Sequence, residues 1–476
     1  MEINYTAVLP EIILSIAGIL LMLLIPFTPE SKQTRLGYLA LAGFVLAFVS
    51  VLLQWGQTDL TFFNMVFQDN FGQFSRSLFL FAGSVICVIS MHYLERDRFL
   101  KAEYFSLLLF ATMGMCLMAT SADLVMTFLG IEILSIASYV LAGYRLGESK
   151  STESAMKYFI LGAFSTAFLL YGIAFIYGVT GSTQYLGIAE AISGLQSYPA
   201  ILLLGVGLVF VGFGFKSALA PFHVWTPDVY EGAPIPITAY LAVASKAAAI
   251  VTFLRILYQV VPDLSWNWQQ LLWISAVLTM AVGNLAALTQ SNIKRMLAYS
   301  SIAHAGYLLV GLAAHNLMGA QGVLFYLLAY SFMTLGAFTV IQLVGRKDEE
   351  FIEIKDYAGV GYRYPFLGLS LSVFMISMAG IPLTAGFTGK LFLFAAAIER
   401  EMYGLVIIAV IASAIGVYYY LRVLVFMYMR EAESETPSFA LTLTARVVIV
   451  IMLLGTLYLG IFPGTMLSIV SEAASF

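Results

Sequence analysis

Long apolar runs follow one another along this chain and are separated by short polar stretches. A bilayer has a hydrocarbon core of ~30 Å, so a run of ~20 apolar residues predicts one membrane-spanning helix. This criterion predicts about fourteen spans. Their centres lie near residues 17, 46, 82, 111, 132, 167, 210, 247, 279, 305, 332, 381, 416 and 453. The pattern therefore predicts an all-α polytopic membrane protein.

Composition supports the same class. Hydrophobic residues make up 61% of the 476 residues and charged residues 11%, whereas a soluble domain carries about 25% charged residues. The chain shows no nucleotide-binding motif, haem-binding pair or iron–sulfur cysteine cluster, and Cys87 and Cys116 match no disulfide or metal spacing. We therefore expect the lipid bilayer as a partner, and neither a cofactor, a metal nor a nucleic acid bound by this chain.

Basic residues are divided unevenly between alternate loops. The loops after predicted spans 1, 3, 5, 9, 11 and 13 contain Lys32, Arg35, Arg96, Arg98, Lys101, Arg145, Lys150, Lys294, Arg295, Arg346, Lys347, Lys355, Arg363 and Arg430. The opposite loops contain only Arg400. Because Lys and Arg collect in short cytoplasmic loops, this asymmetry predicts that both termini are periplasmic.

Three further sequence features concern one acidic loop, the region before the first span and three arginines near span ends. The loop after span 7 is an exception to the charge pattern, because it carries Asp228 and Glu231 without a Lys or Arg. No Arg-rich and Ser-rich transit segment precedes the first span, which favours the inner membrane of a bacterium. Arg76, Arg255 and Arg422 lie toward span ends, and we interpret them as interface anchors.

Four ionisable residues lie well inside predicted spans, namely Glu132, Lys216, Lys246 and Lys390. A lysine at mid-bilayer costs about 2.5–3.5 kcal/mol on insertion scales, so such residues mark functional sites by default. The four residues therefore suggest a path for charge. One alternative is a static Glu132–Lys216 ion pair that fixes helix packing. Another is a chain that acts only as a structural spacer, for which four buried ionisable residues are costly.

Two predicted spans are interrupted by proline near a lysine, because Pro221 follows Lys216 and Pro382 precedes Lys390. Proline removes an amide donor, and irregular backbone at membrane depth survives only inside protein or beside a wet cavity. Paired interrupted helices indicate inverted repeats of a transporter. We predict broken helices 7 and 12 within two inverted five-helix repeats, helices 4–8 (103–260) and 9–13 (268–430). Three N-terminal helices (1–102) and a C-terminal helix (431–476) flank them.

Three segments carry a family resemblance. Phe215–Tyr240, which includes the run Pro-Asp-Val-Tyr-Glu-Gly-Ala-Pro, resembles the antiporter-like membrane subunits of respiratory complex I, and its form is similar to that of the N-type members. Asn292–Tyr307 and Ala379–Phe387 are of the same kind. Mrp-like cation/proton antiporters and subunits of membrane-bound hydrogenases share the lysine and glutamate framework and remain the alternative.

The resemblance implies a role as one subunit of a proton-translocating NADH:quinone oxidoreductase. It implies that NADH, FMN, iron–sulfur clusters and quinone belong to other subunits, and that neighbouring antiporter-like and small membrane subunits are partners. It also implies a helix 5 carboxylate at Glu132, its ion-pair partner at Lys216, the central proton carrier at Lys246 and the exit lysine at Lys390.

These roles agree with elementary electrostatics. Apolar surroundings weaken the hold of a lysine on its proton and a nearby carboxylate strengthens it, so forming and breaking the Glu132–Lys216 pair would control proton movement. His223, His304 and Lys157 are further candidates for the relay. Each histidine has a packing role as its alternative, and Lys157 has a snorkelling role at the interface.

Overall fold

The computed structural model describes residues 4–97, 101–345, 351–431 and 441–475. Three of the basic residues in the predicted charge pattern, Arg98, Arg346 and Lys347, lie outside these described residues.

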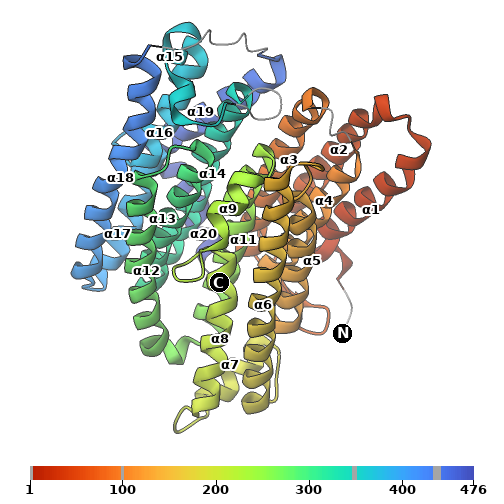
Figure 1. Cartoon of the computed structure of the whole chain (residues 1–476). Coiled ribbons are helices and arrows are strands. Elements are labelled where there is room, and N and C mark those ends of the chain that lie inside the picture. Colours follow the sequence, from red (N-terminus) through yellow and green to blue (C-terminus); the bar gives the residue numbers. More distant parts are fainter. Residues whose placement is uncertain (1–3, 98–100, 346–350, 432–440, 476) are drawn as a thin grey trace.

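The described chain is a bundle of long helices (Figure 1). Helices dominate because a helix satisfies the backbone polar groups of an apolar run within the segment itself. The α-helices are α1 (Leu9–Leu24), α2 (Leu36–Leu52), α3 (Asn70–Asp97), α4 (Glu103–Thr120), α5 (Leu124–Ala142), α6 (Ser149–Thr180), α7 (Tyr185–Ser193), α8 (Ala200–Lys216), α9 (Trp225–Gly232), α10 (Ile235–Tyr240), α11 (Lys246–Arg255), α12 (Ser265–Leu288), α13 (Ile293–Ala314), α14 (Leu317–Val344), α15 (Val360–Arg363), α16 (Pro365–Ala379), α17 (Ala385–Glu399), α18 (Tyr403–Met429), α19 (Leu443–Ile461) and α20 (Gly464–Ala474).

Shorter elements connect these helices. The π-helical segment η4 (Leu241–Ser245) joins α10 to α11, and a second one, η5 (Ile256–Val260), continues α11, so that the four form one continuous rod. The 3-10 turns are η1 (Tyr5–Val8), η2 (Ile25–Phe27), η3 (Glu30–Arg35), η6 (Pro262–Leu264) and η8 (Ile354–Tyr357). Strands β1 (Asp59–Thr61) and β2 (Val66–Gln68) form a small antiparallel hairpin in which Leu60 pairs with Phe67.

Twelve helices of the described chain are long and apolar enough to cross a membrane. The predicted span near residue 210 corresponds to the shorter apolar helix α8, which ends at Lys216. The predicted span near residue 381 corresponds to α16 and α17, which are separated by residues 380–384. Both helices that the sequence predicts to be broken are therefore interrupted beside their lysines.

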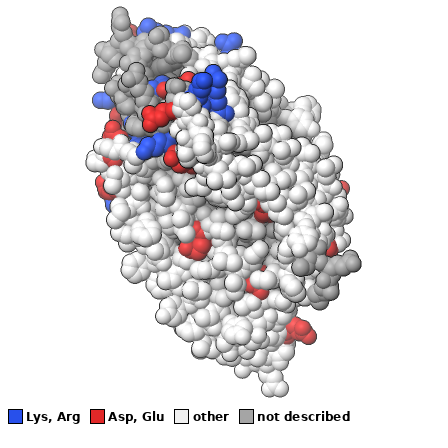
Figure 2. All heavy atoms as spheres, turned by 90° about the vertical axis from the view of Figure 1, so that its right-hand side faces the viewer, with Lys and Arg blue, Asp and Glu red and all other residues white. Residues whose placement is uncertain are grey.

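Loops from distant parts of the sequence meet at the two ends of the bundle. At one end, residue Asn292 forms a bridge with Glu353, and Lys150 forms an ion pair with Glu231. We call this the basic end, and Figure 2 shows Lys and Arg side chains gathered at the upper end of an otherwise largely uncharged face. The opposite end contains the β1–β2 hairpin, which bridges to Ser121.

The central helices are the most buried part of the molecule. The rod formed by α10, η4, α11 and η5 is buried along its whole apolar window, and α13 and α14 are almost completely buried. Other spans, such as α1, α6, α18 and α19, bury only 33% of their window. The central rod and α13 therefore provide an interior in which polar groups meet other protein groups instead of lipid.

Two of the three interpreted anchors are buried instead. The Arg76 and Arg255 residues are 0% exposed. Arg76 forms a 2.7 Å ion pair with Glu11, and Arg255 forms a 2.8 Å ion pair with Asp69. The anchor interpretation is wrong for these two residues, because each finds a carboxylate on another segment of the chain. Arg422, which is half-buried, donates a 2.8 Å hydrogen bond to the Leu288 carbonyl.

Candidate functional site

Lys246 lies at the start of α11, directly after the π-helical segment η4, and is 2% exposed. Its Nζ donates to the Ser301 carbonyl at 2.5 Å and also to the Ser301 hydroxyl. No carboxylate forms an ion pair with Lys246 in the described part of the chain. Its ammonium is therefore held only by neutral oxygen atoms of α13.

Lys216 is the last residue of α8, where the broken helix ends. Its Nζ donates to the Ser135 hydroxyl at 2.8 Å and to the Tyr158 hydroxyl at 3.3 Å. It also lies 5.3 Å from the centroid of the Tyr158 ring and 5.9 Å from that of Tyr139, within the range of a cation–π attraction. Hydroxyls and aromatic faces thus surround this lysine.

The predicted Glu132–Lys216 ion pair is not formed in this structure. Among the described ion pairs none joins these residues, and the buried Glu132 Oε1 has no hydrogen-bond partner. Ser135 lies three residues after Glu132, on the same side of α5, and occupies the position beside Lys216. A direct contact would therefore require the Glu132 or Lys216 side chain to move.

Lys390 contacts the end of α16, where the helix break leaves backbone carbonyls free to bind a cation. Its Nζ donates to the carbonyls of Met378 at 3.1 Å and Ala379 at 3.2 Å, which are the last two residues of α16. Carbonyls at a helix C-terminus carry partial negative charge and favour a cation. A further 2.8 Å hydrogen bond goes to Ser413, and the Tyr307 ring lies 4.8 Å away.

Gly380 makes this approach possible. Its φ of +84° is a left-handed conformation that suits glycine. A Cβ at this position would lie 3.0 Å from the Lys390 Nζ. The break in the helix and the close packing of the lysine therefore depend on the same residue.

His304 lies on α13, one turn after the Ser301 that holds Lys246. Its Nδ1 lies 2.5 Å from the Tyr326 hydroxyl and its Nε2 lies 2.9 Å from the Tyr420 hydroxyl. Tyr420 in turn shares a hydrogen bond with Ser300. The candidate histidine is thus part of a buried chain of groups that both donate and accept protons.

The other two relay candidates lie apart from this network. His223 is half-buried between α8 and α9, and its buried Nδ1 has no hydrogen-bond partner. Lys157 forms ion pairs with Glu153 and with Asp228, each at 2.6 Å, near the basic end. No described contact joins either residue to Lys216, although Lys157 directly precedes Tyr158 in sequence.

Asp228 and Glu231, the acidic exceptions to the charge pattern of the sequence, lie on α9 and form ion pairs with cations of other helices. Asp228 accepts from Lys157 and from Arg295, and Glu231 accepts from Lys150 and from Arg295. We call these five residues the α9 ion cluster. Burial alone would raise the pKa of Asp228 and of Glu231, but hydrogen bonds from the cations outweigh burial and hold each pKa below its ordinary value.

The ion cluster also positions the Lys216 environment. Trp225, on the same short helix, stacks on Tyr158 with ring centroids 4.5 Å apart and donates to the Phe215 carbonyl at 3.0 Å. Arg295 connects the cluster to the start of α13, the helix that carries Ser301. Helix α9 therefore links the surroundings of two buried lysines.

Several residues of this site were not singled out from the sequence. Ser135, Ser301, Ser413, Tyr158, Tyr326 and Tyr420 all contact a predicted candidate. The available signal was a hydroxyl or phenol within an apolar run, but this signal occurs in many other places along the chain. In the described part of the chain no group of three or more His, Cys, Asp or Glu residues is arranged to hold a metal.

Similarity to known proteins assigns this chain to a family. Residues 121–416 match the family model described as "NADH:quinone oxidoreductase/Mrp antiporter, TM". NADH-quinone oxidoreductase subunit N of Trichlorobacter lovleyi is 49% identical over 88% of this chain and 86% of its own length. The chain belongs to the NADH:quinone oxidoreductase/Mrp antiporter family. The matched region contains Glu132, Lys216, Lys246, His304 and Lys390.

Solved structures of this family give the same result. A chain of respiratory complex I from Thermus thermophilus is 35% identical, with a TM-score of 0.83, over 98% of this chain and 100% of that chain. A chain of the Mrp complex from Dietzia is 18% identical, with a TM-score of 0.85, over 98% and 97% of the two chains. At this lower identity the likeness to the Mrp chain shows a shared fold alone. The relatives in sequence therefore group this chain with subunit N.

Proposed function

We propose that this chain is a proton-translocating membrane-arm subunit of a NADH:quinone oxidoreductase. Its relatives carry the name of subunit N of that enzyme. The observation that supports translocation is the set of three buried lysines, Lys216, Lys246 and Lys390, each held by neutral oxygen atoms. Lysine can lose its proton when it is desolvated, which an arginine cannot do. These lysines are therefore suited to carry a proton and release it.

The proposed cycle starts at Glu132. When this carboxylate approaches Lys216, it favours the charged lysine, and when it withdraws, Lys216 gives up its proton more easily. A changed charge at Lys216 then acts on Lys246, because like charges in a medium of low dielectric repel strongly. Lys246 discharges toward Lys390, from which the proton leaves.

Residues of α13 and its neighbours connect the two later steps. Ser301 contacts Lys246, and His304 lies one turn further along the same helix between two tyrosine hydroxyls. Hydroxyl and imidazole groups can donate and accept a proton in turn. We assign His304 and its partner Tyr420 to the link between Lys246 and Lys390. His223 and Lys157 remain candidates for the intake side.

The repeat arrangement is part of the same proposal. We assign 103–260 and 268–430 to two inverted five-helix repeats, with 1–102 and 431–476 as flanking parts. Support comes from the two interrupted helices, each of which places a lysine beside its break. Pro221 and Pro382 lie at these interruptions.

The proposal also covers location and partners. We place the chain in the inner membrane of a bacterium, with both termini periplasmic and the basic end cytoplasmic. Its partners are the neighbouring antiporter-like and small membrane subunits. NADH, FMN, iron–sulfur clusters and quinone are bound by other subunits, and this chain contributes proton movement to their oxidoreductase activity.

Three alternatives are less well supported. A static Glu132–Lys216 pair that fixes packing would have the two side chains in contact, which they are not in this structure. An independent cation/proton antiporter would resemble the Mrp chain, but that likeness is limited to the fold at 18% identity. A spacer would have no use for three buried lysines.

The deciding experiment is performed on membranes that contain Lys246→Met. We expect the complex to assemble on a native gel while NADH-driven quinone reduction and proton translocation both fall by about tenfold or more. Lys246→Arg should fail as well, because arginine keeps its proton. Lys101→Met, at an exposed lysine, is the matched control and should leave both rates unchanged. Normal pumping by Lys246→Met would refute the carrier role, and NADH-independent transport would favour the antiporter.

A further inference from the structure

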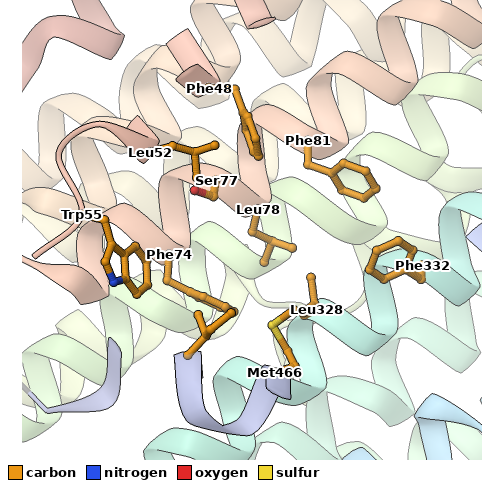
Figure 3. A pocket seen from close by; sticks show the side chains of 11 residues that line it. Phe48, Leu52, Trp55, Phe74, Ser77, Leu78, Phe81, Leu328, Phe332 and Met466 are labelled. Atoms are coloured by element: carbon orange, nitrogen blue, oxygen red, sulfur yellow. The ribbon is translucent and has the colours of Figure 1, made fainter. Parts of the chain in front are cut away.

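A cavity of about 400 Å³ lies between α2, α3, α14 and α20, apart from the lysine network. Figure 3 shows its side chains, which are almost all apolar. The lining residues are Phe48, Leu52, Trp55, Phe74, Ser77, Leu78, Phe81, Leu328, Phe332, Met466 and Ile469. An apolar cavity of only ~150 Å³ stays dry and binds benzene, so this larger one is suited to a longer hydrocarbon ligand.

The cavity lies at membrane depth. Three of its four helices, α2, α3 and α14, are candidate spans. Trp55 and Phe332 are at opposite ends of the lining in Figure 3, so the cavity extends from the end of α2 toward the middle of α14. Leu52, which is 51% exposed, forms part of the edge, so the cavity opens onto the outer surface of the bundle. A lipid chain can therefore enter from the side.

The rim of the cavity is polar on the side of α20. The Trp55 indole donates to Glu472 Oε2 at 3.2 Å, and Gln321 donates to Ser471 at 3.0 Å. Tryptophan prefers the level of the lipid headgroups. Neither the lining residues nor these rim residues include a Lys or Arg. Of these described rim residues, the charged one is Glu472, whose negative charge is complementary to an ammonium headgroup and repels an anionic one.

We propose that this cavity binds one acyl chain of a zwitterionic phospholipid with a primary ammonium headgroup. The acyl chain fills the space between Leu78, Phe81 and Phe332, and the ammonium group pairs with Glu472. The bound lipid then joins the N-terminal helices α2 and α3 to α14 and α20 of the C-terminal half. It acts as a structural ligand at a seam between parts that are distant in sequence.

The test uses the intact complex, reconstituted into vesicles of equal parts ethanolamine and glycerol phospholipid. In one sample the ethanolamine lipid carries a photoreactive acyl chain, and in a second sample the glycerol lipid carries it. We expect the ethanolamine lipid to label peptides of α3 and α14 that line the cavity, at least about fivefold more than the glycerol lipid does. Equal labelling by both lipids would overturn the headgroup assignment.

Two variants and a control locate the site. Leu328→Trp fills the cavity and should lower this labelling for both lipids, and Ser77→Met tests the same point with a smaller change. Leu285→Trp is the matched control, because Leu285 is 55% exposed on α12 and does not line the cavity. Glu472→Gln should abolish the preference for ethanolamine lipid while acyl labelling remains. Labelling that Leu328→Trp leaves unchanged would overturn the site, as would a neighbouring subunit or a quinone tail found in its place.

Discussion

Two buried arginines and three buried lysines of this chain differ in their partners. Arg76 and Arg255 each contact a carboxylate, Glu11 and Asp69 respectively. Lys216, Lys246 and Lys390 instead contact hydroxyls, carbonyls and aromatic rings. An arginine stays charged inside a protein, and a carboxylate beside it offsets the cost of burying that charge. A lysine can become neutral, so it can remain buried without one.

The two buried arginines have a structural role, and the three buried lysines have a proposed functional role. Arg76 ties α3 to α1, and Arg255 ties α11 to the start of α3 beside the aromatic rings of Phe67 and Phe71. The first pair holds two N-terminal helices together, and the second holds the start of α3 against α11. The lysines have no such fixed partner, and we propose that their proton occupancy changes during turnover. The cost of burial is met by an ion pair in the arginine group, and we propose that the lysine group meets it by loss of the proton.

The largest expected effect is on stability, in Arg76→Met. This change leaves the Glu11 carboxylate buried without its cation and should cost about 3–5 kcal/mol. We expect little assembled complex on a native gel and a lower thermal midpoint. The double variant Arg76→Met, Glu11→Leu should recover much of the loss, because both charges are then removed. Normal assembly of the single variant would show that this pair has no structural role.

The second prediction concerns the other group, in Lys390→Met. Removing this lysine leaves no opposite charge behind, so the thermal midpoint should stay close to that of the wild type. Proton translocation should fall by about tenfold or more, because a carrier is lost. Lys390→Arg should also be inactive, since it keeps the charge but cannot release the proton. A fully active Lys390→Arg would remove the distinction drawn between the two groups.

A smaller effect is expected from Ser301→Ala. The variant loses one of the two oxygen atoms that hold Lys246 but keeps the backbone carbonyl. A lost hydrogen bond to a charged group is worth about 1.5–3 kcal/mol, and the remaining carbonyl should reduce the loss. We expect a severalfold fall in translocation without loss of assembly. Ser331→Ala is the control, because its hydroxyl is also buried but bonds only to Leu327 of its own helix.

The smallest effect is expected at the α9 ion cluster, in Asp228→Asn. Ion pairs that are partly exposed contribute about 0.2–1 kcal/mol. The pKa of Asp228 is lowered in the folded protein, so its contribution is present above the unfolded pKa and is lost as the pH falls through the folded value. The thermal midpoints of wild type and variant should differ by a constant amount near neutral pH. That difference should shrink below about pH 4, the unfolded pKa of aspartate; a gap that persists there would contradict the assignment.

Local sequence patterns predicted much of the fold. The span near residue 247 and the breaks beside Lys216 and Lys390 follow from apolar runs and prolines, which act within a single segment. The predicted roles of Arg76 and Arg255 as anchors were wrong, because position near a span end says nothing about a carboxylate on another helix. The direct Glu132–Lys216 pair also could not be decided from spacing, since α5 and α8 meet only in the folded bundle.

The sequence by itself determined the membrane class, the breaks and the identity of the buried ionisable residues. Hydropathy, proline and charge are properties of short segments, and the bilayer acts on each segment separately. Only the tertiary structure decided which partner each buried cation receives. Ser301 lies 55 residues from Lys246 and Glu11 lies 65 residues from Arg76 along the chain. Because a carboxylate partner holds a buried cation in an ion pair and a hydroxyl or carbonyl does not, packing between helices separates the structural arginines from the lysines proposed to carry protons.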